Sequence, residues 1–167
     1  MSFARLLKEH SALASALDLV GDKWTLMILS GCLASVCRFN ELESALGINR
    51  TILSSRLDKL IGAGLIEKRI YHTKPQRYEY IITDIGKALR PVLVGLAAWA
   101  ETHIINDECP VSMVHKECNT KAQIHIYCEH CDRVVPADDI TSKLNPNAGS
   151  ESVKVYNESR EHFVHLK

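Results

Sequence analysis

Residues 38–64 have the sequence RFNELESALGINRTILSSRLDKLIGAG, in which two helical patterns are separated by one glycine. In the first pattern apolar side chains recur every three or four residues until Gly47, a residue type that commonly ends helices. Asn49, a favoured N-cap residue, predicts the start of a second, amphipathic helix that ends near Ile61. Two such helices joined by a short turn, the second rich in small polar and basic side chains, predict a helix-turn-helix.

The segment that follows predicts a β-hairpin. Residues 65–71 (LIEKRIY) and 77–83 (RYEYIIT) alternate apolar with polar side chains over strand-length runs. The connecting residues 72–76 (HTKPQ) contain a proline and basic or polar side chains, which suits a wing that reaches a phosphate backbone.

Helical patterns also flank these elements. We expect one helix before Gly21, a second over residues 24–33 that is apolar nearly all round and therefore buried, and a long one from Asp84 to His103. The order helix, helix, helix-turn-helix, hairpin, helix predicts a mainly α fold with a β-hairpin wing, a winged helix-turn-helix.

The formal net charge is zero, but the charges are unevenly distributed along the chain. Residues 49–77 contain seven basic and two acidic groups, a balance of +5. Residues 101–167 contain seven basic and eleven acidic groups, a balance of −4. This asymmetry indicates one face for a polyanion and another that avoids it, although a merely solvated basic surface is the alternative.

Several motifs resemble the HxlR-type family of bacterial winged-helix regulators, which are relatives of the MarR group. The resemblance covers residues 11 to about 103. Its marks are GDKW at 21–24, RFNEL at 38–42, GLIEKR at 64–69 and PQRYEYIITDIG at 75–86. It implies a transcription regulator that binds double-stranded DNA.

The second helix of the pair is expected to enter the major groove. With the apolar stripe of this helix turned inward, its outward side chains are those of Thr51, Ser55, Asp58 and Lys59. Thr51, Ser55 and Lys59 can hydrogen-bond base edges or phosphates. DNA phosphates repel the Asp58 carboxylate, so we expect Asp58 only to be solvated. The wing is expected to add phosphate contacts. The predicted DNA-contacting residues are Arg38, Asn49, Arg50, Thr51, Ser54, Ser55, Arg56, Lys59, Lys68, Arg69, His72, Lys74 and Arg77.

Some of these side chains have a second explanation. Arg38 resembles the family's phosphate-facing arginine, but it can equally be a helix-start residue tied to Glu41. Arg69 lies on the same strand face as Glu67, so the two can form a surface ion pair worth little energy. At least one of the tyrosines at positions 78 and 80 is expected in the core.

The outer helices imply a homodimer. The apolar stripe from Leu89 to His103 is longer than a winged helix of this size needs for its own core. The resemblance implies that this helix and residues 13–20 pack against a partner subunit, and a two-fold dimer would bind a pseudo-palindromic site. The predicted interface residues are Leu13, Leu17, Leu89, Leu93, Leu96 and Trp99.

The sequence changes character after Asn106, so we predict a division into residues 1–105 and a small β-rich C-terminal extension over 106–167. Two ligand pairs, His115-x2-Cys118 and Cys128-x2-Cys131, have the spacing of a zinc ribbon, in which two knuckles hold one tetrahedral ion. Asn119 and Asp132 follow the pairs, where a positive φ is usual and glycine is common. Strands are expected over residues 123–127, 133–135 and 153–156.

Other roles for these cysteines and histidines remain open. His125 and His130 are alternative ligands, a Cys128–Cys131 disulfide would make a redox site, and the cysteines can also be purely structural. Cys32 is expected in the core, whereas Cys37 can be exposed. Redox-sensing members of the family carry a cysteine before the first helix, where this chain has Ser11. The partners of such a regulator can include an effector, either a small molecule or a redox agent, which the sequence does not identify.

The chain shows no sign of an enzyme or a membrane protein. It has no nucleophile elbow, phosphate loop or paired catalytic carboxylates. No apolar run approaches the roughly 18 residues of a membrane span, and residues 1–10 lack the apolar core of a signal peptide. We therefore expect a cytoplasmic regulator; a winged-helix adaptor that binds only proteins is the alternative function.

Overall fold

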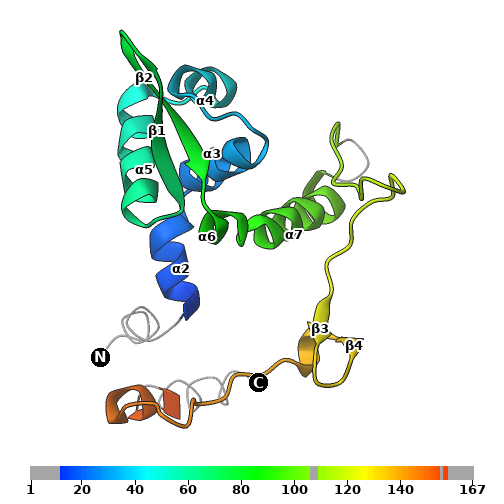
Figure 1. Ribbon diagram of the computed structural model, residues 1–167. Coiled ribbons are helices and arrows are strands. Elements are labelled where there is room, and N and C mark those ends of the chain that lie inside the picture. Colours follow the sequence, from blue (N-terminus) through cyan, green and yellow to red (C-terminus); the bar gives the residue numbers. More distant parts are fainter. Residues whose placement is uncertain (1–11, 106–108, 155, 158–167) are drawn as a thin grey trace. The chain divides into compact units, whose positions relative to one another are not determined.

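The computed structural model describes residues 12–105, 109–154 and 156–157 (Figure 1). These residues form two compact units. The larger unit, residues 22–125, contains the predicted helix-turn-helix and wing. The smaller unit combines residues 12–21 with the described residues from 126 onward.

The larger unit has the predicted order of helices and strands. Its helices contact a two-stranded hairpin, which in Figure 1 lies between α5 and α4. The elements are α3 (Lys23–Leu33), α4 (Phe39–Leu46), α5 (Arg50–Gly62), β1 (Ile66–Thr73), β2 (Gln76–Ile82), α6 (Asp84–Lys87), α7 (Arg90–Ala100) and a π-helical turn (Glu101–Ile105).

Helix α3 is central in this unit, because it contacts α4, α5, α7 and β2. It was expected to be buried, and Ile28 and Leu29 have no exposed surface. Leu42 of α4 and Leu53 of α5 are equally buried, so the apolar stripes of the helix-turn-helix close onto α3. Cys32 is also in this core, as predicted. Its burial, and to a smaller extent the nearby Cys37, raises the pKa of its thiol to about 12.

The helix boundaries follow from capping residues that the sequence contains. Gly47 ends α4 with a φ of 60°, a left-handed conformation that glycine adopts without a steric penalty. Asn49 then caps α5, its side-chain oxygen accepting a 2.8 Å hydrogen bond from the backbone N–H of Thr51. Asp22 caps α3 through the N–H of Thr25 at 3.1 Å. The turn between the two helices is therefore the one predicted.

The hairpin is antiparallel, with Glu67 opposite Ile81 and Arg69 opposite Glu79. Arg69 does form a surface ion pair, but with Glu79 on the other strand and not with Glu67, which was the alternative considered: Arg69 Nη2 lies 2.7 Å from Glu79 Oε1. Directly opposite residues of a hairpin are closer than residues two apart on one strand, roughly 5 Å against 6.5 Å. The cross-strand acid therefore captures the guanidinium.

The predicted long helix from Asp84 to His103 is interrupted. α6 ends at Lys87, and α7 begins at Arg90 with Pro91 in its first turn. Proline lacks the N–H that would bond to the carbonyl four residues earlier, at Lys87, and its ring collides with that carbonyl. Pro91 therefore gives a physical reason for the interruption at residues 88–89.

The smaller unit contains α2 (Ala12–Val20), which confirms the predicted first helix, and a hairpin of β3 (Ile126–Cys128) and β4 (Arg133–Val135). A 3₁₀ turn follows over Ala137–Asp139. The expected strand at residues 153–156 is wrong for the described positions: Val153 is helical, its N–H bonding to the carbonyl of Gly149 at 3.0 Å. Val155 lies outside the described residues.

Among the residues that the structure describes, no helix is long and apolar enough to cross a membrane.

Candidate nucleic-acid interface

The outer face of α5 is polar and open to solvent. Leu53, Leu57 and Leu60 are buried and fix the rotation of the helix about its axis. The opposite side therefore faces outward, and Thr51, Ser54, Ser55, Asp58 and Lys59 are all exposed, as the helical wheel predicted. This face offers hydroxyl and ammonium groups at the spacing of successive turns, which is the chemistry that reads base edges.

Two predicted contact residues of α5, Arg50 at its start and Arg56 near its middle, have partners within the protein. Arg50 Nη1 lies 2.7 Å from Glu43 Oε2, and its guanidinium lies over the ring of Phe39, 4.9 Å from the centroid. Arg56 is half-buried, with its Nε 3.0 Å from Asp22 Oδ1. Burial alone would raise the pKa of Asp22, but hydrogen bonds from Thr25 and Arg56 lower it overall. Arg56 thus has a structural role, and its contact with DNA stays a prediction.

Arg38 occupies the helix-start position that was one of its two explanations. Its backbone N–H donates to Glu41 Oε2 at 3.1 Å, and its Nη1 lies 3.4 Å from Glu41 Oε1. The guanidinium also lies over the ring of Tyr71, 4.5 Å from the centroid. Half of the Arg38 side chain remains exposed, so these contacts orient the cation without hiding it.

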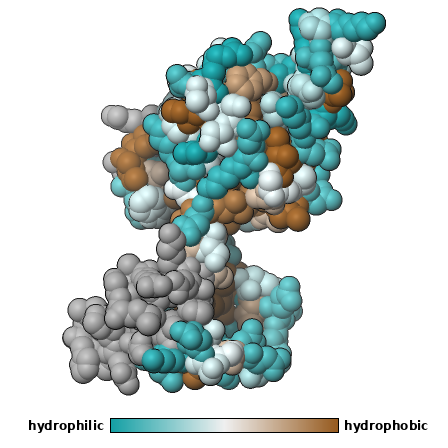
Figure 2. Space-filling view, turned by 90° about the vertical axis from the view of Figure 1, so that its left-hand side faces the viewer, coloured by the Kyte–Doolittle hydropathy of each residue, from teal (hydrophilic) through white to brown (hydrophobic). Residues whose placement is uncertain are grey.

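The hairpin carries exposed cations along β1 and at its tip. Lys68 Nζ lies 4.0 Å from the ring centroid of Tyr78, and His72 Nδ1 donates to the carbonyl of Pro75 at 2.9 Å. No ion pair within the described ranges involves Lys74 or Arg77. Figure 2 shows the tip at the top of the view as a hydrophilic surface. Such cations can neutralise phosphates at little desolvation cost.

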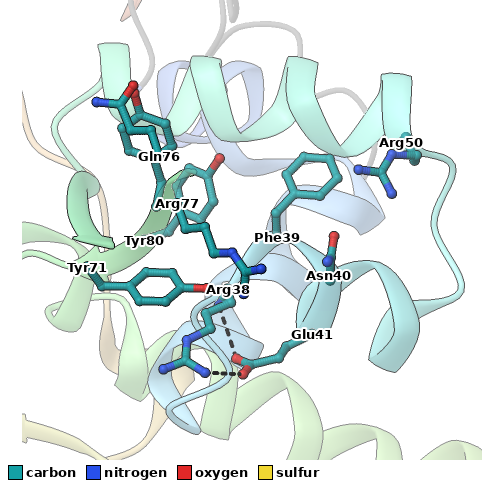
Figure 3. Close-up of a pocket in the computed structure, with 10 residues that line it drawn as sticks. Arg38, Phe39, Asn40, Glu41, Arg50, Tyr71, Gln76, Arg77 and Tyr80 are labelled. Atoms are coloured by element: carbon teal, nitrogen blue, oxygen red, sulfur yellow. Dashed lines mark hydrogen bonds and ion pairs between the residues drawn. The ribbon is translucent and has the colours of Figure 1, made fainter. Parts of the chain in front are cut away.

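A cavity of about 540 Å³ lies where the starts of α4 and α5 meet the hairpin (Figure 3). Tyr80 forms part of its wall. Tyr80 is buried, which confirms the prediction that at least one of the tyrosines at positions 78 and 80 lies in the core. The sequence did not predict this cavity, because its lining comes from three segments that only the fold brings together. The lining residues are Arg38, Phe39, Asn40, Glu41, Arg50, Tyr71, Gln76, Arg77, Tyr78 and Tyr80.

Large apolar side chains are exposed on the two helices for which a partner subunit was predicted. On α7, Leu96 is 50% and Trp99 52% exposed, whereas Leu93 and the preceding Leu89 are partly covered. On α2, Leu13 is 67% and Leu17 56% exposed. Exposed apolar patches of this kind often mark interaction sites.

The predicted zinc-ligand pairs each lie on a tight loop. After His115-x2-Cys118, Asn119 has a φ of 55° and its N–H donates to the carbonyl of His115 at 2.8 Å. After Cys128-x2-Cys131, Asp132 has a φ of 51°. The positive φ predicted at both positions is confirmed. The pairs belong to different compact units, and no group of three or more potential ligands occurs in the described part of the chain.

Comparisons with known proteins agree with this architecture. Residues 19–108 match the model of a family described as HxlR-like helix-turn-helix. The uncharacterized HTH-type transcriptional regulator Rv3095 of Mycobacterium tuberculosis is 35% identical over 139 residues, which are 83% of this chain and 88% of that protein. YvaP of Bacillus subtilis, with the same description, is 36% identical over 51% of this chain and 80% of its own length.

Solved structures give the same result. PA1374 from Pseudomonas aeruginosa, provisionally described as a transcription factor, matches with a TM-score of 0.66 and 29% identity over 85% of this chain and 97% of its own. PA1607, with the same provisional description, matches with a TM-score of 0.73 and 27% identity over 83% of this chain and 99% of its own. The similarity to these structures therefore extends beyond the winged unit.

Proposed function

Because the chain belongs to the HxlR-like helix-turn-helix family of transcription regulators, we propose that it binds a pseudo-palindromic DNA operator sequence-specifically as a homodimer. The observation that carries this proposal is the outer face of α5. Its polar side chains are held outward by the buried stripe of Leu53, Leu57 and Leu60. A recognition helix needs this combination of fixed rotation and exposed hydrogen-bonding groups.

The wing supplies the sequence-independent part of the binding. Lys74 and Arg77 at the hairpin tip are exposed and have no acidic partner among the described residues. They can therefore bind phosphates without first breaking an ion pair, and the release of counterions from DNA favours the complex. A protein-only adaptor would not need this cationic tip.

The homodimer is supported by the apolar surface of α7. Leu96 and Trp99 lie at a spacing of three residues, on one side of the helix, and each exposes about half of its surface. Exposed apolar area costs roughly 25 cal/mol per Å² relative to burial, so a second copy that covers it is favoured. A closed two-fold pair would place two α5 helices in successive major grooves.

Gel-shift titration with the DNA upstream of the chain's own coding region tests DNA binding. We expect a shifted complex that survives an excess of unrelated duplex and whose stoichiometry is two chains per site. Sedimentation of the free protein at micromolar concentration gives the oligomeric state. No complex with specific DNA would contradict the operator, and a monomer would contradict the two-fold arrangement.

For the C-terminal extension we propose one zinc ion per chain, coordinated by His115, Cys118, Cys128 and Cys131. The support comes from each loop taken by itself, since both have the ligand spacing and the positive φ of a zinc knuckle. A Cys128–Cys131 redox pair is the competing proposal, and all six cysteines are free thiols in this structure.

A further inference from the structure

The side chain of Arg50 joins the first turn of α5 to α4. Phe39 and Glu43 are one helical turn apart on α4, so both project from the same face of that helix. Arg50 Nη1 lies 2.7 Å from Glu43 Oε2, and the guanidinium lies over the Phe39 ring, 4.9 Å from its centroid. In Figure 3 the Arg50 side chain extends from the start of α5 toward Phe39. One acid and one ring of α4 therefore hold a cation of α5.

These contacts orient Arg50 without enclosing it. The side chain of Arg50 is 66% exposed, whereas that of Glu43 is only 28% exposed. A guanidinium has several N–H donors in a rigid plane, so one edge can bind Glu43 while another stays open to an anion. An ion pair this exposed adds little to the stability of the fold. Its main effect is therefore to order Arg50 before an anion arrives.

The order of this side chain matters because of its place on α5. Arg50 is the first residue of the helix that we propose enters the major groove, directly after the N-cap Asn49. Phosphate contacts at the start of such a helix set its register on the duplex. A cation held in one position favours one register, whereas a mobile cation pairs with any phosphate nearby.

We infer that Glu43 is a positioning residue for operator recognition. Through its ion pair it holds Arg50 over Phe39, so that the open edge of the guanidinium meets one backbone phosphate when α5 is in register. This inference rests on the proposed function. It differs from the ordinary expectation for an acid near DNA, because the Glu43 carboxylate repels phosphates and yet favours the operator over unrelated DNA.

The first experiment measures two dissociation constants of the full-length protein at one ionic strength, for unrelated duplex and for the operator found by gel shift. Their ratio is the specificity. Glu43→Gln removes the charge and keeps the size of the side chain. The lost charge favours both DNAs alike, but only the operator complex must now order a mobile Arg50. We expect the ratio to fall about threefold to tenfold. An unchanged ratio would overturn the inference.

Glu67→Gln on β1 is the charge-matched control. Glu67 is exposed, and no ion pair within the described ranges involves it. Its loss should change both dissociation constants by the same factor and leave the ratio as in the wild type. A fold defect in Glu43→Gln would also weaken both complexes equally, so it cannot produce the expected result. An equal fall of the ratio in Glu67→Gln would mean that charge alone acts, against the inference.

A double-mutant cycle shows whether Glu43 acts through Arg50. Arg50→Lys keeps the positive charge but lacks the planar fork of the guanidinium. It should lower the ratio by itself, and in its presence Glu43→Gln should change the ratio by no more than about twofold. Losses that simply multiply would mean that the two residues act separately, and the positioning role would be wrong.

A measurement on the free protein separates this inference from the proposed function. Nitrogen spin relaxation at Arg50 Nε should report an ordered side chain in the wild type and a mobile one in Glu43→Gln. Equal mobility in the two proteins would overturn the inference even if the operator is bound. An ordered Arg50 in a wild-type protein that binds all duplexes equally would contradict the proposed function, and the role of Glu43 in recognition with it.

Discussion

Arg56 Nε in α5 lies 3.0 Å from Oδ1 of Asp22, 34 residues earlier in the chain. Asp22 is also the N-cap of α3, so one carboxylate both starts the central helix and holds the recognition helix. The ion pair therefore sets the position of α5 relative to the core helix against which it packs. From the sequence we predicted only a DNA contact for Arg56 and no role for Asp22.

We predict that Asp22→Ala lowers the free energy of unfolding by about 1–2 kcal/mol, the usual cost of losing an N-cap. Trp24 and Trp99 both lie in the larger unit, so urea unfolding followed by tryptophan fluorescence reports on that unit. Asp58→Ala, at an exposed position of α5, is the control and should change stability by less than about 0.5 kcal/mol. Equal effects of the two substitutions would argue against a structural role for Asp22.

The pH dependence of stability provides a second test at Asp22. Its pKa is lowered in the folded protein, so the unfolded chain binds the proton first as pH falls. The extra stability is therefore complete above the unfolded pKa, about 4, and is lost as pH falls through the lower folded pKa. Asp22→Asn keeps a good N-cap but removes the charge. We expect its stability deficit to be the same at pH 7 and 5 and to shrink at pH 3; a constant deficit would contradict the electrostatic explanation.

For the wing we predict a loss of affinity that does not depend on DNA sequence. The double substitution of Lys68 and Lys74 to alanine should reduce the slope of log K against log salt by roughly one unit for each lost phosphate contact. Lys87→Ala, outside the hairpin, is the matched control. An unchanged slope in the double variant would remove the wing from the interface.

On α5 the expected effect is on sequence preference instead. Ser55→Ala removes a hydroxyl from the exposed face while leaving the helix and the net charge intact. It should change the ranking of operators with single base substitutions, with discrimination at one position falling by about 1–3 kcal/mol, and leave the salt slope as in the wild type. Competition titration against a panel of such operators measures this, and an unaltered ranking would mean that Ser55 does not read a base.

At the predicted dimer interface, Trp99→Asp should give monomers, because a charge replaces an exposed apolar ring that the partner is expected to cover. Sedimentation gives the mass, and circular dichroism shows whether the fold is kept. Ile85→Asp changes another exposed apolar residue, 67% accessible, and should remain a dimer. A dimeric, folded Trp99→Asp protein would place the interface elsewhere.

The zinc proposal predicts about one zinc ion per chain in reduced protein purified without chelators, and none in Cys128→Ser. Cys37→Ser, outside the four ligands, should retain the metal. The winged unit has its own core, so it should stay folded in Cys128→Ser. Elemental analysis that finds no zinc in the wild type, together with a reversible Cys128–Cys131 disulfide under mild oxidant, would favour the redox pair.

Local signals in the sequence were sufficient for the helix-turn-helix. Gly47 and Asn49 determine the turn through their own backbone preferences, and the buried leucines of α5 repeat at helical spacing. The same kind of local signal, Pro91, shows why the last helix is divided, although the apolar stripe running through it suggested continuity. Positive φ at Asn119 and Asp132 could likewise be expected from residue type.

Features that depend on tertiary packing could not be predicted in this way. The partner of Arg69 depends on the register of the hairpin, which periodicity does not specify. The cavity depends on how closely the start of α4 approaches β2. Its three arginines had each been interpreted singly as DNA contacts, and only the fold shows that they share one space with four aromatic rings.

Cys32 bears on how electrophiles can act on this regulator. Alkylating agents react with the thiolate, and a buried thiol with a pKa of about 12 supplies almost none at neutral pH. Modification of Cys32 therefore requires α3 to leave the core, which is a local or global unfolding event. A thiol-specific modifier that changes the folded regulator must act through one of the other five cysteines, and slow labelling of Cys32 would report how often the core opens.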